Sequence, residues 1–237
     1  MRSIIDLILS LFRKAPEPTP VPAPEPAPVT EEKSEEIEMP TPIIVTGFVS
    51  EKFESGGRGV STVSTGKGDN GGVSYGKHQL STNAGTMAAF LKSEFGKPFT
   101  EFNGYTPGTT AFNAVYKSVA SKRADEFAAA QAAFIRKTHY EPQAATLEKA
   151  GWNLGKRHQA VREMVYSTAV QYGPNTSVLL NCSWLPSDTD EQLIIKAQQF
   201  KKRSVPTYFK KSSIAVQKSV EDRCQNEQAV LLAFLKG

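Results

Sequence analysis

The stretch FESGGRGVSTVSTGKGDNGGVSYGKHQLS, residues 53–81, contains eight of the 17 glycines of the chain. After its first residue it has only two carboxylates, Glu54 and Asp69, which lie 15 positions apart. Glycine permits tight bends and lets a ligand approach the backbone closely. The stretch therefore predicts a sharply folded segment with two acids and room for a bulky ligand.

A small β-ribbon is predicted over residues 59–77. Thr62 and Val63 precede the turn sequence GKGDNGG, and Val73 and Tyr75 follow it. β-branched residues on both sides of an Asp-Asn-Gly turn are typical of a β-hairpin.

The rest of the domain is predicted to be helical. The segment IVTGFVSEKFESGG suggests a short buried helix that ends near Glu54. Amphipathic spacing, capping residues and glycine or proline stops predict further helices. These cover residues 83–96, 109–120, 123–140, 156–174, 189–204 and 221–237. The expected fold class is α+β, mainly α, with the ribbon inserted between the first helices.

Composition separates the first 42 residues from the remainder. They hold nine of the 15 prolines, and they carry four Lys/Arg against eight Asp/Glu, which leaves 24 against 16 for the rest. Such a proline-rich segment cannot bury enough apolar surface to fold. We expect a linker over residues 15–42 and one globular domain, a monomer, over residues 43–237. The charge of the domain, +8, favours an anionic partner, but no nucleic-acid-binding signature accompanies it.

The N-terminal residues 1–14, MRSIIDLILSLFRK, include an apolar run from Ile4 to Phe12 that is interrupted by Asp6 and Ser10. The run is too short to span a bilayer, which needs about 20 apolar residues. A short amphipathic helix is expected, which uses residues 4–14 to lie on a membrane surface or to dock on a carrier protein. The alternative is a disordered end with a chance apolar cluster.

Neither a metal nor another cofactor is expected. Cys182 and Cys224 have no histidine at metal-ligand spacing, so two buried thiols are favoured over a disulfide. His139 and His158 also lack partners and are expected at the surface. Phosphate-loop and nucleophile motifs are absent from the sequence.

The two acids are predicted to have opposite protonation states. Glu54 ends a helix among apolar neighbours, which favours its protonated form, whereas Asp69 lies in a hydrated turn, which favours its carboxylate. Two such carboxyls across a groove are the machinery of glycosidic-bond cleavage. The structural alternative is that an Asp-Asn-Gly turn and a helix-ending glutamate occur for reasons of backbone geometry.

The run ESGG…GGVSYGKHQLS resembles the active-site region of the lysozyme superfamily, where a glutamate ends a helix, a β-ribbon follows, and a Gly-x-x-Gln type stretch leads on. The longer run FESGG…GKGDNGGVSYGKHQLS…GTMAAFL is similar to muramidase domains with a chitosanase-like fold. These occur in phage lysis proteins and at the ends of some type VI secretion spike proteins. The resemblance is dense over residues 48–92 and weaker through REMVYSTAVQYGP.

The resemblance implies hydrolysis of the β-1,4 bond between N-acetylmuramic acid and N-acetylglucosamine in peptidoglycan. Glu54 would be the general acid and Asp69 the general base of an inverting reaction. It also implies an endolysin-like enzyme of phage or prophage origin, made in the cytoplasm and active in the bacterial periplasm and cell wall.

Further residues are predicted to contact the sugar. Tyr75 would present its ring to a sugar face or cover the core, and Gln79 offers a donor and an acceptor to an N-acetyl group. Ser74 and His78 are weaker candidates, because a ribbon serine is ordinarily structural and a histidine there is usually polar surface. Thr168, Gln171 and Tyr172, near the end of the 156–174 helix, would form the opposite wall.

Three alternatives remain from the sequence. A lytic transglycosylase would use Glu54 without Asp69, and a chitosanase would cut a cationic polymer that suits a basic domain poorly. A non-catalytic module would only bind wall glycan or a virion component.

Overall fold

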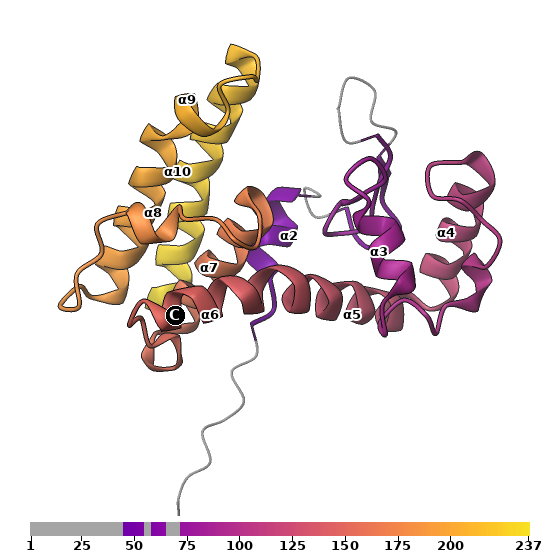
Figure 1. Cartoon of the computed structure of the whole chain (residues 1–237), viewed down its shortest axis with the longest axis horizontal. Coiled ribbons are helices and arrows are strands. Elements are labelled where there is room, and N and C mark those ends of the chain that lie inside the picture. The colour runs from indigo at the N-terminus through magenta and orange to yellow at the C-terminus, as the bar shows by residue number, and fades with distance from the viewer. Residues whose placement is uncertain (1–44, 55–57, 65–71) are drawn as a thin grey trace, which may run out of the picture. The chain divides into compact units, whose positions relative to one another are not determined.

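The computed structural model describes residues 45–54, 58–64 and 72–237 (Figure 1). The chain divides between Pro40 and Thr41, and all the described residues belong to the second unit, Thr41–Gly237. The predicted N-terminal helix and linker, as well as Asp69, lie outside the described residues.

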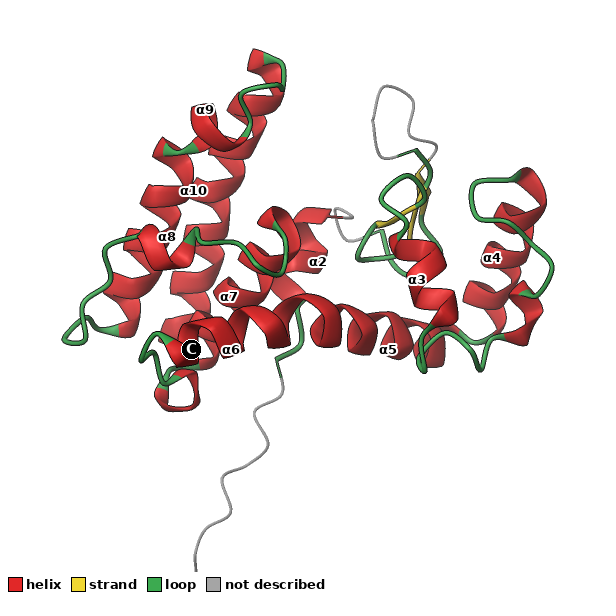
Figure 2. Cartoon of the chain, in the orientation of Figure 1, coloured by secondary structure: helices red, strands yellow, loops and turns green. Residues whose placement is uncertain are grey.

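Helices make up most of the described chain, and one small sheet accompanies them (Figure 2). The α-helices are α2 (Phe48–Glu54), α3 (Thr86–Lys92), α4 (Thr110–Lys122), α5 (Ala124–Ile135), α6 (Glu141–Lys149), α7 (Gln159–Tyr172), α8 (Asp190–Arg203), α9 (Val205–Tyr208) and α10 (Ile214–Lys236). Short 3-10 turns cover Thr100–Phe102, Leu154–Lys156 and Leu179–Asn181, and a π-helical turn covers Arg136–Tyr140. The α+β, mainly α fold class is confirmed.

The sheet has three short antiparallel strands in the order β1 (Val63–Ser64), β2 (Ser74–Tyr75) and β3 (Leu80–Ser81). Val63 pairs with Tyr75, and Tyr75 pairs in turn with Leu80. The predicted ribbon is confirmed by the pairing of β1 with β2. The third strand was not predicted, because two residues are too few to show an alternating pattern.

Helix boundaries differ from the predictions at several places; the helix expected over 221–237, for example, already begins at Ile214. The helix expected over 83–96 ends at Lys92, because Ser93 is extended and its hydroxyl donates to the Phe90 carbonyl at 2.6 Å. The helix expected over 123–140 ends at Ile135 and continues through the π-helical turn into α6. Pro142 lies in the first turn of α6, directly after the π-helical turn.

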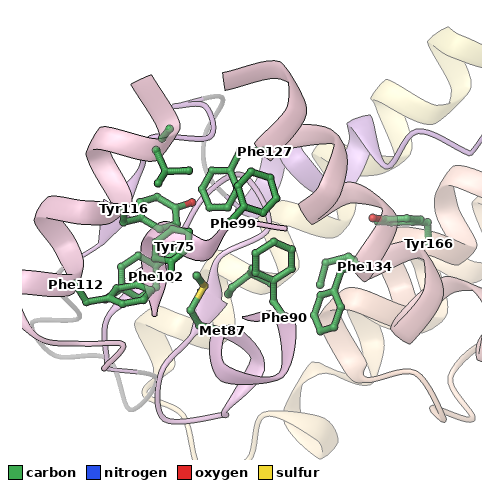
Figure 3. Close-up of a cluster of buried hydrophobic side chains, with 14 of the residues drawn as sticks. Tyr75, Met87, Phe90, Phe99, Phe102, Phe112, Tyr116, Phe127, Phe134 and Tyr166 are labelled. Carbon is green, nitrogen blue, oxygen red and sulfur yellow. The ribbon is translucent and has the colours of Figure 1, made fainter. Parts of the chain in front are cut away.

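Two hydrophobic clusters form the core. The first gathers aromatic rings around the sheet, α3, α4 and α5, including Tyr75, Phe112 and Tyr116 (Figure 3). The ring of Tyr75 lies edge-on to Phe112, with centroids 5.2 Å apart, and 4.8 Å from Tyr116. This cluster holds the ribbon against the helices that follow it.

The second cluster lies among α2, α6, α7, α8 and α10, with Val49, Val161, Met164, Ile194 and Leu231 fully or almost fully buried. The neighbouring helices α8 and α10 contact each other extensively (Figure 1). Thr189 and Gln192 form a capping box that fixes the start of α8. This cluster positions the elements that carry the candidate site.

Candidate active site

The start of α2 is fixed by a buried carboxylate on α7. Glu163 Oε1 accepts hydrogen bonds from Thr46 N at 2.7 Å, Thr46 Oγ1 at 2.9 Å and Gly47 N at 3.2 Å. Burial raises the pKa of Glu163, and these hydrogen bonds oppose the rise without cancelling it. The position of α2, and hence of its last residue, depends on α7.

Gly47 allows α2 to approach α7 closely. Its φ is +76°, a conformation that favours glycine, and a Cβ added there would lie 2.7 Å from Cζ of Tyr166. A larger residue would push α2 away from Tyr166.

Glu54 is the last residue of α2, as predicted, but its surroundings differ from the apolar ones expected. Its Oε1 accepts a hydrogen bond of 2.6 Å from Nη1 of Arg223 on α10, and the two side chains are 22% and 16% exposed. The helix α10 thus adds a cation, remote in sequence, that the expectation of apolar neighbours did not include.

Arg223 is itself one member of an alternating series of charges. Lys201 Nζ donates to Glu227 Oε2 at 2.8 Å, and neither side chain is exposed at all. Burial acts to lower the pKa of Arg223, but the charges of Glu54 and Glu227 outweigh it and raise that pKa. Burial acts to raise the pKa of Glu227, but Lys201 and Arg223 outweigh it and lower that pKa. We call Lys201, Glu227, Arg223 and Glu54 the charge chain.

Glu54 faces a cavity of about 690 Å³, which we call the Glu54 cavity. Three helices and the segment after α9 form its walls. Its lining includes Glu54 from α2, Gln171 from α7, and Ser219, Arg223 and Asn226 from α10. A carboxyl, an amide and a hydroxyl thus meet at a hollow of a size typical of ligand sites.

Glu51, one turn before Glu54, ties α2 to the ribbon. Lys77 Nζ donates to Glu51 Oε2 at 3.2 Å, and His78 Nε2 lies 3.6 Å from Glu51 Oε1. Lys77 and His78 lie between β2 and β3, so the connection between these two strands is attached directly to the helix that carries Glu54.

Tyr75 and Ser74 lie inside the protein. Tyr75 is fully buried, and its hydroxyl donates to Asn113 Oδ1 at 2.6 Å and accepts from Gly108 N at 2.8 Å. Ser74, its neighbour on β2, is also buried. The core alternative for Tyr75 therefore describes the structure, and we do not retain Tyr75 or Ser74 as sugar contacts.

His78 is buried as well, against the expectation of polar surface. Burial lowers its pKa to about 4, with smaller contributions from Lys77 and His139, so the ring is neutral near pH 7. Gln79 is partly buried at φ +51°, and its Nε2 donates to the Gly76 carbonyl at 2.9 Å. Its side chain thus stabilises its own turn.

On α7, the structure brings one of the three predicted wall residues to the cavity. Gln171 lines the Glu54 cavity. Thr168 is fully buried, so it has no access to solvent. The ring of Tyr172 packs edge-on against Tyr208 and Phe209, and burial raises the pKa of its phenol. Of the predicted site residues that are described, only Glu54 and Gln171 meet.

Sequence reasoning missed Glu163, Lys201, Arg223 and Glu227. A signal was present for two of them. Glu227 lies on the buried side of α10, together with Cys224 and Leu231. Lys201 lies on the buried side of α8, together with Ala197. A charged residue within an apolar stripe indicates a buried partner. For Arg223, which is partly exposed, no comparable pattern exists.

Other findings limit the chemistry of the described part. Cys182 and Cys224 are both buried free thiols, as predicted. His158 is exposed, as predicted, whereas His139 is partly buried. Within residues 45–54, 58–64 and 72–237, no three His, Cys, Asp or Glu side chains gather in the manner of metal ligands.

No helix in the described ranges combines the length and the apolar character needed to cross a membrane.

The fold is similar to that of a chitosanase. The model superposes on the crystal structure of native chitosanase from Bacillus subtilis MY002 with a TM-score of 0.56 and 16% sequence identity, covering 78% of this chain and 86% of the other. The chitosanase-like expectation for the fold is thereby confirmed, and a domain of the lysozyme-like class is defined.

Sequence comparison identifies the family. Residues 46–228 match the model of the family described as "Type VI secretion system spike protein VgrG3-like, C-terminal". The type VI secretion system spike protein VgrG3 of Vibrio cholerae serotype O1 (strain ATCC 39315 / El Tor Inaba N16961) is 38% identical over 189 residues, which are 78% of this chain. The chain belongs to this family of VgrG3-like C-terminal domains. It spans only 18% of the length of the Vibrio protein.

Proposed function

We propose that the chain is a glycoside hydrolase that cuts the β-1,4 bond between N-acetylmuramic acid and N-acetylglucosamine in bacterial peptidoglycan. The observation that carries this proposal is the placement of Glu54 at the edge of the Glu54 cavity, held by Arg223. The chitosanase-like fold and the membership in the VgrG3-like family support it.

Glu54 acts as the general acid. Arg223 holds Oε1, and the described residues offer no hydrogen bond to Oε2, so Oε2 is the oxygen that carries a proton to the leaving oxygen. Glu227 also lies close enough to Arg223 to raise its pKa, so Arg223 keeps one anionic neighbour when Glu54 carries the proton.

Asp69 acts as the general base. In the sequence, Asp69 lies between the strands β1 and β2. Lys77 and His78, which follow β2, are attached to α2 through Glu51. An inverting reaction requires the two carboxyls about 6.5–9.5 Å apart, with the water between them, whereas a retaining one requires about 5–5.5 Å. A crystal structure with a bound oligosaccharide measures this distance directly.

Polar side chains in the Glu54 cavity suit an N-acetylated sugar. Gln171 and Asn226 each offer an amide donor and an acceptor, and Ser219 offers a hydroxyl. These groups match the acetamido and hydroxyl groups of the peptidoglycan glycan. The positive charge of residues 43–237 agrees with an anionic wall as substrate.

The family also suggests where the enzyme works. The Vibrio relative is named as a type VI secretion spike protein, and we extend to this chain the role of an effector domain that acts on periplasmic peptidoglycan. The segment 4–14 would then dock the domain on a carrier protein.

The test uses the full chain with purified peptidoglycan. Glu54→Gln and Asp69→Asn should each abolish the fall in turbidity. Glu94→Gln, which replaces an exposed carboxylate just after α3, should leave the fall in turbidity unchanged. Mass spectrometry of the products should show reducing muramic acid ends.

Other outcomes contradict the proposal in distinguishable ways. Anhydro ends, with Asp69→Asn as active as the wild type, would show a transglycosylase. Cleavage of glucosamine polymers in preference to peptidoglycan would show a chitosanase. Binding without any cleavage would show a wall-binding module.

A further inference from the structure

A second cavity, of about 420 Å³, lies at the connection between α6 and α7. Its walls are the segment 150–153, the residues Lys156 and Arg157, and Pro186 from the loop before α8. The Glu54 cavity lies at the other end of α7, near Gln171. Since α7 has 14 residues, the helix separates the two sites by about 20 Å.

The wall of this cavity is well supported. Trp152 N donates to the Leu147 carbonyl at 3.0 Å, and Asn153 Oδ1 accepts from Lys156 N at 3.2 Å. The ring of Trp152 meets that of Trp184 edge to face, with centroids 5.2 Å apart. Trp184 is fixed in turn, because its Nε1 donates to the Leu193 carbonyl at 2.9 Å. Trp152 nevertheless remains partly exposed.

The cavity keeps an unneutralised positive charge. Arg157 is engaged with Asp190 Oδ1 at 3.3 Å and with the Asp188 carbonyl at 3.1 Å. Lys156 is exposed, and no side chain of the described residues forms an ion pair with it. Asn153 uses its oxygen for the backbone, so its amide Nδ2 is left to donate.

We propose that this cavity is a second, non-catalytic binding site for a saccharide unit that bears a carboxylate: the lactyl carboxylate of N-acetylmuramic acid in a bare glycan, or a carboxylate of the peptide stem where the lactyl group is amidated. Trp152 offers an apolar ring to a sugar face, Asn153 donates to a ring substituent, and Lys156 pairs with the carboxylate. One exposed cation beside one aromatic ring favours a single acidic sugar over a phosphate backbone, which requires several cations in a row. The identity of the glycan rests on the proposed function.

The distance between the two cavities predicts what the second one does. A ligand in it cannot touch Glu54, so it does not contribute to the chemical step. A long glycan that is held at both cavities gains affinity through the link between them, whereas a short fragment reaches only one. The second site should therefore matter for polymeric substrate and not for short oligosaccharides.

A direct test uses intrinsic fluorescence. Trp152 and Trp184 are the only two tryptophans of the chain, and they are in contact, so their emission reports on this cavity. Titration of the full chain carrying Glu54→Gln with a soluble N-acetylglucosamine–N-acetylmuramic acid disaccharide should change the emission in a saturable way. Lys156→Gln should weaken this binding by roughly tenfold, and Lys149→Gln, an exposed lysine of α6 outside the cavity, should not. N,N′-Diacetylchitobiose, which lacks the carboxylate, should bind to the Glu54→Gln chain as weakly as the disaccharide binds to the chain that also carries Lys156→Gln.

The second arm uses insoluble peptidoglycan. In an otherwise wild-type chain, Trp152→Ala and Lys156→Gln should slow clearing of sacculi several-fold but leave cleavage of a soluble tetrasaccharide unchanged. Trp152→Phe should retain most of the wild-type rate, which separates the loss of a ring from a folding defect.

Three results would overturn the inference. They are an unchanged emission on titration, equal clearing of sacculi by all variants, and an equal loss on polymer and tetrasaccharide. The last would assign the cavity to the catalytic groove. If the chain cleaves no glycan but the disaccharide still binds in a Lys156-dependent way, the proposed function fails and the second site stands.

Discussion

Nη1 of Arg223 lies 2.6 Å from Oε1 of Glu54, although 169 positions separate the two residues in the chain. The contact joins the last helix to the first described one. The helix α10 thus completes the surroundings of the proposed acid, and the charge chain continues behind it to Glu227 and Lys201.

Replacement of Arg223 should impair both activity and folding. Arg223→Gln leaves Glu54 and Glu227 without their shared cation, and the loss of one partner of a largely buried ion pair costs about 3 kcal/mol. We expect at least a tenfold fall in peptidoglycan cleavage, measured as release of reducing ends at a temperature where the variant is folded. Arg203→Gln, an exposed arginine of α8, is the control. Unchanged cleavage by Arg223→Gln would remove Arg223 from the site.

The buried pair of Lys201 and Glu227 should show strong coupling. Glu227→Leu alone leaves a buried ammonium unpaired and should lower the free energy of unfolding by about 3–5 kcal/mol, whereas Lys201→Met together with Glu227→Leu should recover most of this loss. Urea unfolding of the two single variants and the double variant measures the coupling. Simple additivity of the single effects would contradict it.

His78 should make the protein less stable at acidic pH. Its pKa in the folded state is about 4, whereas that of an unfolded histidine is 6.5, so between these values the unfolded state binds more protons. Stability should therefore fall as the pH drops from about 6.5 to 4, by on the order of 3 kcal/mol at the lower end. The carboxylate of Glu51 favours the protonated ring of His78, but Lys77 pairs with the same carboxylate. Burial therefore has the largest effect on the pKa of His78 and lowers it.

Urea unfolding at several pH values checks this dependence. His78→Gln should flatten the slope, and the slope that remains is assigned to His139, whose pKa burial also lowers. An equal slope in His78→Gln would refute the assignment.

Gly47 should be sensitive to one methyl group. Gly47→Ala combines a positive φ with a contact of 2.7 Å to Tyr166, whereas Gly104→Ala has a positive φ of +82° and open space around it. Strain alone costs about 1–2 kcal/mol, and the contact should add about 1–3 kcal/mol at Gly47. Thermal unfolding of both variants gives the difference, and only Gly47→Ala should lose activity, because α2 carries Glu54.

Local signals in the sequence were sufficient for some elements. The end of α2 at Glu54 and the pairing of β1 with β2 both follow from short patterns, a glycine stop in one case and a turn sequence in the other. Most of the longer helices were predicted for the same reason. The role of Asp69 stays a prediction.

Burial of individual residues could not be predicted in this way. Tyr75 and His78 have the pattern of ribbon residues, but their surroundings come from Asn113, Gly108 and Tyr166, which the chain reaches much later. Arg223 is equally remote from Glu54. Contacts between distant segments decide which ribbon residues face the interior.

The two cysteines also bear on the redox conditions that the domain tolerates. Burial raises the pKa of Cys182 to about 12 and also raises that of Cys224, so both thiols stay protonated and unreactive. The fold needs no oxidant to form. Transfer from a reducing compartment to an oxidising one should leave both thiols as they were.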